Sequence, residues 1–268
     1  MCGSGRLPAM RDDSALPPDA ALPTDGEALG GGVFPALATR LVTALHLAVP
    51  PVGISFHDDV PVTVTPYDGP MSETAADGRR GRVAAGCVFW LHGAERSFST
   101  VPDDHGNCSV GQVTHGLADV EDVVGHGDVQ ALLGSGWVDE AALATVPRIT
   151  SHPGSVVYGP VAAGGPEPDV VLLRVNGRQM MVLHDAVPEM SIEGKPQCHI
   201  VALAFEHGRV AASVGCALSR ARTGMRPEEM TCAVPGRRFA EVVDAVERTA
   251  AVDNQVATYA ARDARRSA

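Results

Sequence analysis

Lysine is almost missing from this chain of 268 residues, in which Lys195 is the only lysine among 21 basic residues. Aromatic residues are also scarce, at 4% of the sequence. The first absence nearly excludes a Schiff base or a lysine general base, because both need that side chain. Lys195 lies between Gly194 and Pro196, which is typical of a solvated loop. The second absence means that Val, Leu and Ala must build most of the core.

Basic charge is in deficit, since 32 acidic residues give a formal net charge of −11. A phosphate backbone or an anionic membrane surface is repelled by such a chain. Nucleic acid is therefore not the expected partner. This charge balance is compatible with a small-molecule ligand. The composition does not indicate an oligomeric state.

Long apolar runs are absent as well. The nearest candidate, 41–56, is interrupted by His46 and by Pro50 and Pro51, so we expect no membrane span. The N-terminus shows no basic start followed by an apolar run and a small-residue cleavage site. We therefore expect a cytoplasmic protein with reduced cysteines, for which metal or redox chemistry is more typical than disulfides.

Several familiar catalytic motifs are missing. There is no G-x-x-x-x-G-K-[ST] loop, no G-x-S-x-G turn, no H-E-x-x-H helix and no C-x-x-C pair. The glycine pairs at 125–127 and 134–136 lack the third glycine of a dinucleotide-binding loop. These absences argue against a P-loop nucleotidase, a dinucleotide-dependent dehydrogenase, a zincin protease and a thioredoxin-like protein.

Composition divides the chain into three parts. Residues 1–32 are rich in Gly, Pro, Ala and Asp and have few large apolar side chains, so we expect a disordered tail that can be deleted. Residues 33–250 read as one domain, and 251–268 as the end of a C-terminal helix and a tail.

Within the domain, apolar runs and helical periodicity alternate. A helix of about three turns is expected after Phe34, with further helices at 83–92, from Cys108, from 177 to 184, at 198–206 and from 236. Strands are expected at 52–56, 60–64, 97–101, 168–175, 209–214 and 230–234, short helical pieces across 118–147, and loops at 102–107 and 215–229. This order predicts an α/β (mixed α+β) fold: a single domain with a mixed sheet flanked by helices.

Four of the six cysteines are expected at the ends of elements: Cys87, Cys108, Cys198 and Cys216. A helix N-terminus favours the thiolate, so we expect lowered thiol pKa values there. If the fold gathers these ends, the four thiols form a metal site. Of the other two cysteines, Cys2 lies in the tail, and Cys232 lies mid-strand, where a buried apolar role is typical.

A histidine accompanies two of these cysteines. His105 precedes Cys108 by three residues, so Cys108 could act as a nucleophile with His105 as its base. His199 follows Cys198 directly, and either His105 or His199 could complete a metal shell. Taken singly, each cysteine is equally well explained as a buried structural thiol, and each histidine as a surface or satisfied residue.

A second set of polar residues could hold a substrate. Asn176 and Gln179 follow the most apolar strand, at the place where open α/β sheets bind ligands. Arg220 lies in an arginine-rich segment after Cys216 and could bind a carboxylate or phosphate. A solvated arginine face is the competing interpretation.

Several blocks, in this order, resemble the bacterial and archaeal domain-of-unknown-function family 169, from about residue 34 to 248. They are PPVGISF at 50–56, GCVFWLHGA at 86–94, GNCSVGQVTHGL at 106–117, PDVVLLRVNGRQMMVLHDA at 168–186, CHIVALAFEHGRVAASVGCALSR at 198–220, and PGRRFAEVVDAVE near the end. The resemblance implies one mixed α/β domain and recurring cysteines that fall on Cys87, Cys108 and Cys198. Cys216 falls where many relatives have a glycine-rich stretch. The resemblance implies no reaction.

Three hypotheses remain at this stage. The first is a thiolate-metal protein, plausibly an enzyme acting on a small molecule, with an iron–sulfur cluster or a single metal bound by the cysteines. The second is a metal-free enzyme with Cys108 as nucleophile. The third is a binding or sensing module for a small anionic ligand.

Overall fold

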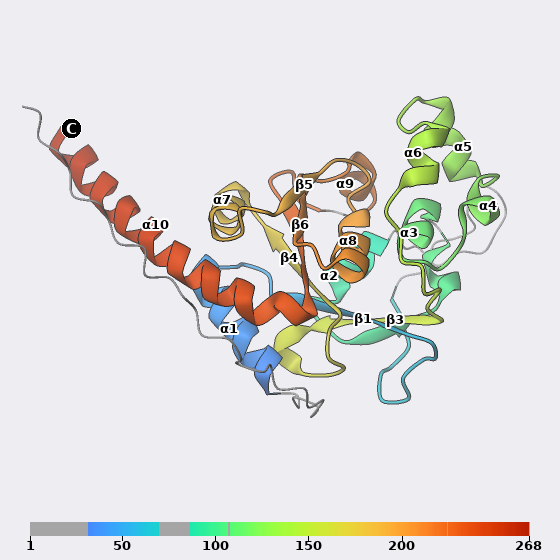
Figure 1. The fold of residues 1–268 in the computed structure, drawn as a ribbon, viewed down its shortest axis with the longest axis horizontal. Helices are drawn as coiled ribbons and strands as arrows, with labels where there is room; N and C mark the ends of the chain where they lie inside the picture. The colour runs from blue at the N-terminus through green and yellow to red at the C-terminus, as the bar shows by residue number, and fades with distance from the viewer. Residues whose placement is uncertain (1–31, 70–85, 107, 224, 268) are drawn as a thin grey trace, which may run out of the picture.

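The computed structural model describes residues 32–69, 86–106, 108–223 and 225–267 (Figure 1). The tail expected at 1–32 lies outside the described residues, apart from Gly32. Within the described part of the chain, no helix is both long and apolar enough to cross a membrane.

A mixed sheet of seven strands forms the centre of the described structure, in the order β2-β3-β1-β4-β7-β6-β5. Its strands are β1 (Val52–His57), β2 (Phe98–Thr100), β3 (Ser155–Pro160), β4 (Val170–Val175), β5 (Ser191–Glu193), β6 (Ala211–Ser213) and β7 (Met230–Pro235). The pairing of β5 with β6 is parallel and all the others are antiparallel. The expected α/β fold with a mixed sheet is confirmed.

Ten α-helices accompany the sheet in the described residues. They are α1 (Val33–Leu45), α2 (Gly86–His92), α3 (Ser109–Thr114), α4 (Val120–Val123), α5 (Gly127–Gly134), α6 (Glu140–Thr145), α7 (Gly177–Ala186), α8 (His199–His207), α9 (Ala217–Thr223) and α10 (Phe239–Ser267). Helix α10 packs along α1 and then projects from the body of the molecule (Figure 1).

Two hydrophobic cores lie on opposite faces of the sheet. Strand β4 divides its side chains between them: Val170 and Leu172 belong to the core with α2, α3 and α8, whereas Val171 and Leu173 belong to the core with α1, α7 and α10. Successive side chains of a strand point to opposite faces, so a strand covered on both sides must be apolar throughout. This explains the continuous apolar run at 170–173.

Some expected elements differ from the structure. Residues 60–64 form turns and not a strand, and 102–105 form a 3₁₀ helix and not an open loop. Strands β3 and β5 and helix α9 were not expected. Helix α9 has seven residues and β5 has three, so their sequences contain few periods, and all three elements depend on tertiary contacts.

Candidate functional site

Each of the four candidate cysteines lies at or beside the start of a helix. Cys87 is the second residue of α2, Cys108 and Cys198 directly precede α3 and α8, and Cys216 directly precedes α9. Helix α2 packs against α9, and α3 packs against α8. These contacts bring together four segments that are far apart in the sequence.

The four cysteines line one small cavity of about 30 Å³. Cys87, Cys198 and Cys216 are buried, while Cys108 is partly exposed. Val110, Asp128, Leu132, Trp137, Pro196, Gln197, Leu218 and Ser219 complete the wall. A cavity of this size has room for roughly one water molecule. Cys232 lies in the core on the other face of the sheet, with its thiol 3.7 Å from the Met190 sulfur, and is a buried apolar residue as expected.

The thiols of the cavity are hard to ionise as they stand. Burial raises the pKa of Cys87 to about 12, and the neighbouring Cys108 adds to that rise. The pKa of Cys198 is raised well above its usual value, again by burial first and then by Cys108 and Cys87. The expectation of lowered pKa values was wrong for these two cysteines, because desolvation outweighs any effect of the helix ends.

The sulfurs do not form a ready-made coordination shell. Among the residues that the structure describes, no three His, Cys, Asp or Glu side chains are arranged to hold a metal ion. The donor set is nevertheless chemically specific, since several thiolates select soft or borderline ions such as zinc, copper(I) and iron in clusters. The thiols would have to move toward one another to share an ion, because zinc–sulfur bonds are about 2.3 Å long.

His105 does not line the cysteine cavity. Its fully buried ring lies 4.6 Å from the ring of Phe89, and its Nε2 is 3.0 Å from the hydroxyl of Thr100. Burial holds its pKa well below the usual histidine value. The backbone joins His105 to Cys108, because the Cys108 amide donates a hydrogen bond to the His105 carbonyl at 3.0 Å. A catalytic role for His105 beside Cys108 stays a prediction without geometric support.

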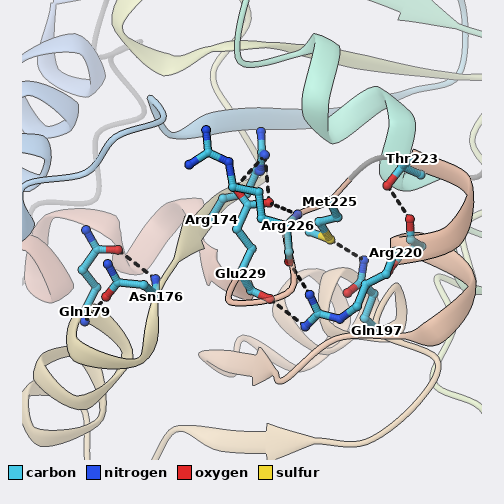
Figure 2. A network of polar contacts seen from close by, with 10 residues as sticks. Arg174, Asn176, Gln179, Gln197, Arg220, Thr223, Met225, Arg226 and Glu229 are labelled. Atoms are coloured by element: carbon cyan, nitrogen blue, oxygen red, sulfur yellow. Dashed lines mark hydrogen bonds and ion pairs between the residues drawn. The ribbon is translucent and has the colours of Figure 1, made fainter.

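Asn176 and Gln179 have their polar groups engaged in the start of α7 (Figure 2). The Asn176 side chain accepts from the Gln179 amide at 3.0 Å, and the Gln179 side chain accepts from the Asn176 amide at 2.8 Å. The Gln179 amide group also donates to the carbonyls of Leu45 and His46. This is a capping box that ties α7 to the end of α1. The predicted substrate-binding role gains no support from these contacts.

Replacing Asn176 by alanine tests this assignment. The change removes the acceptor for the Gln179 amide and should lower the free energy of unfolding by about 1 kcal/mol, the usual cost of an N-cap. Chemical denaturation measures this loss. Thr39, exposed on α1, supplies the control, because its replacement by alanine removes a comparable exposed side-chain hydrogen bond without touching a cap. A loss below about 0.3 kcal/mol for Asn176→Ala would contradict the capping role.

Arg220 is held by main-chain oxygens (Figure 2). Its guanidinium donates to the carbonyls of Val214, at 2.7 Å, and Glu229, at 2.8 Å, and also to that of Arg226. These bonds tie both sides of the 214–229 segment to α9, directly behind Cys216. Arg220 therefore positions this part of the cavity wall, and its predicted substrate-binding role gains no support from these contacts.

Comparison with protein families shows how much of this architecture is shared. The model of domain-of-unknown-function family 169, described as uncharacterised ArCR, matches residues 40–245. The chain belongs to this family. Comparison with curated proteins and with solved structures gives no match. Membership of family 169 thus accounts for most of the chain and assigns no reaction.

Sequence reasoning on this family 169 protein missed Gln197 and Trp137 in the cavity wall. Gln197 is 1% exposed, and its amide nitrogen lies 3.6 Å from the Met225 sulfur (Figure 2). Its side chain also hydrogen-bonds Cys87, which partly opposes the rise in the pKa of that thiol. Its Oε1 has no partner in the described structure. The one sequence feature that could have marked Gln197 as part of the wall is its position directly before Cys198. Trp137 lies in a region of short helical pieces, where no sequence feature marked it as part of the wall.

Proposed function

We propose that Cys87, Cys108, Cys198 and Cys216 bind a thiophilic metal ion, and that the protein is a thiolate-metal protein acting on a small molecule. The observation that carries this proposal is the convergence of four thiols from four helix starts on one cavity. Chance burial of structural cysteines has no reason to gather them, and the one remaining described cysteine, Cys232, lies in the opposite core.

Electrostatics supports a cation in this cavity. The pKa of Cys198 is raised partly because Cys108 and Cys87 carry like charge when ionised. Several thiolates therefore cannot coexist there without a positive charge between them. A bound metal ion reverses that balance, since it deprotonates coordinating thiols outright. The site then binds metal with release of protons.

Cavity size favours one of the two forms of metal site. A volume of about 30 Å³ suits a single ion, provided that the thiols move inward to bind it. An iron–sulfur cluster brings several iron and sulfide atoms and requires the walls to open. We therefore propose a single thiolate-bound ion first and a cluster second. The partly exposed Cys108 is the ligand that lies nearest to entering ions or substrate.

The same cavity also accommodates the metal-free alternative. Cys108 is the accessible thiol, but the described cavity wall contains no histidine that could serve as its base. This difference places the nucleophile hypothesis second. A cytoplasmic location with reduced thiols fits either function.

Metal analysis of protein purified without oxygen tests the proposal. We expect a stoichiometric thiophilic ion, and cobalt(II) added to metal-free protein should give a thiolate charge-transfer band. Serine at Cys87, Cys108 or Cys198 should weaken metal binding by more than about 100-fold, because even outer-shell changes cost about 10–100-fold. Cys232→Ser is the matched control and should bind metal like the parent protein.

The possible outcomes separate the alternatives. A brown protein with iron and labile sulfide would replace the single ion by a cluster. Colourless protein that binds no zinc, iron or cobalt but is rapidly alkylated at Cys108 would overturn the metal proposal in favour of the nucleophile. Unchanged metal affinity in all three cysteine variants, with the Cys232 control, would overturn the assignment of the ligands.

A further inference from the structure

A second pocket adjoins the cysteine cavity. It has a volume of about 180 Å³ and shares Val110, Trp137 and Pro196 with the wall of the cavity. Its other walls come from α6 and the segment after it, which contribute Leu143 and Val146, and from the segment 195–199. Most of this lining is apolar. Lys195 contributes a charged group to this lining, and His199 contributes ring nitrogens that can form hydrogen bonds.

His199 lines this pocket without a hydrogen-bond partner. The residue is 6% exposed, and neither Nδ1 nor Nε2 has a partner in the described structure. The nearest carboxylate, that of Glu193, is 3.7 Å from Nε2, beyond hydrogen-bond distance. A buried polar group without a hydrogen-bond partner is destabilising, so a ligand that hydrogen-bonds to this ring gains binding free energy.

Lys195 supplies the positive charge at the same place. Its Nζ lies 4.5 Å from the centre of the Trp137 ring. In the part of the chain that the structure describes, no carboxylate pairs with this ammonium group. The lysine is exposed and the histidine is buried, so the two mark the mouth and the wall of one pocket.

We propose that this pocket binds a small monocarboxylate, with its apolar body against Trp137 and Val146 and its carboxylate between Lys195 and His199. The wider cleft outside is lined by Asp139 and Glu140, which would repel further negative charge. One anionic group per ligand is therefore favoured over a phosphate or a nucleotide. The volume is below the ~300–1,000 Å³ of drug-sized sites, which limits the ligand to about the size of benzoate.

This pocket is a site separate from the metal site, and its occupation does not require metal. The shared wall of Trp137 and Pro196 lies between the two spaces. A carboxylate held by Lys195 would place the rest of its ligand against this shared wall, on the side away from the cysteine cavity.

Calorimetric titration of metal-free and of zinc-treated protein with benzoate, hexanoate, benzamide and inorganic phosphate tests the proposal. At least one of the two carboxylates should bind both preparations, and benzamide and phosphate should bind at least about tenfold more weakly than that carboxylate. Lys195→Met and His199→Phe should each weaken carboxylate binding by about tenfold. The matched control is Arg178→Met, which removes one positive charge at the ion pair with Asp253, between α7 and α10.

Each outcome is decisive for the pocket. Failure of both carboxylates to bind would overturn the proposal, as would equal binding by Lys195→Met and the Arg178→Met control. Carboxylate binding by protein that takes up no metal would support this pocket while the metal proposal fails. Circular dichroism of His199→Phe confirms that its fold is retained, and Lys195, which is exposed, can be replaced without disturbing the core.

Discussion

Replacing Glu229 by glutamine is expected to lower the free energy of unfolding by about 3–5 kcal/mol, which is a large part of the stability of a typical domain. The Arg174 guanidinium lies 2.8 and 3.0 Å from the two carboxylate oxygens of Glu229 (Figure 2), and each side chain is 10% exposed. The glutamine variant leaves a buried guanidinium without its counter-charge. Such a charge costs far more than the net gain that the intact pair provides.

Two further variants give this prediction its controls. Glu189 pairs with Arg238 at 2.6 Å but is 60% exposed, so Glu189→Gln should cost no more than about 1 kcal/mol. The double variant Arg174→Met/Glu229→Leu removes both charges and should recover most of the loss. Denaturant unfolding measures all three proteins. A cost for Glu229→Gln as small as that for Glu189→Gln would contradict the prediction.

The effect should extend to the candidate site. Glu229 also accepts from the Arg226 amide at 3.0 Å, and its own carbonyl accepts from Arg220. The Glu229 variant is therefore expected to loosen the segment that carries α9 and Cys216. Faster alkylation of Cys216 than in the parent protein, followed by peptide mass spectrometry, would reveal this.

Lowering the pH is expected to destabilise the protein, and the loss should begin at pH values well above those at which carboxylates titrate. His105 and His115 are fully buried, and burial lowers the pKa of His115 to about 4 and that of His105 well below 6.5. Both rings stay neutral in the folded state below pH 6.5, whereas the unfolded chain takes up two protons there. The unfolded state thus binds more protons, and stability falls as the pH falls.

The size of this effect follows from the two histidines. Each contributes about 1.4 kcal/mol per pH unit below 6.5, so the free energy of unfolding should drop by about 3–4 kcal/mol between pH 7.5 and pH 5. Denaturant unfolding at a series of pH values measures this slope. His115→Gln should reduce the slope by about half. A flat profile between pH 7.5 and 5 would contradict the buried neutral state of both rings.

The sequence alone determined the fold class and the main elements. The run at 170–173 is apolar at every position because both faces of β4 are covered, and this pattern cannot be mistaken for a half-exposed strand. Leu37, Leu41 and Leu45 predicted α1 because they recur on one helical face. The position of the cysteines at element ends was also readable, since glycines and polar loops mark those ends.

Tertiary structure alone decided which of these residues meet and in what state. The cavity of Cys87, Cys108, Cys198 and Cys216 depends on packing between helices that are far apart in the chain, which no local pattern encodes. Burial then raised the pKa values of Cys87 and Cys198, opposite to what helix ends alone suggest. The spacing in the sequence suggested that His105 lies beside the Cys108 thiol, but in the fold its ring packs against Phe89 in the aromatic core. Sequence spacing sets which side chains are neighbours along the backbone, whereas solvent exclusion and packing set their contacts and their charge.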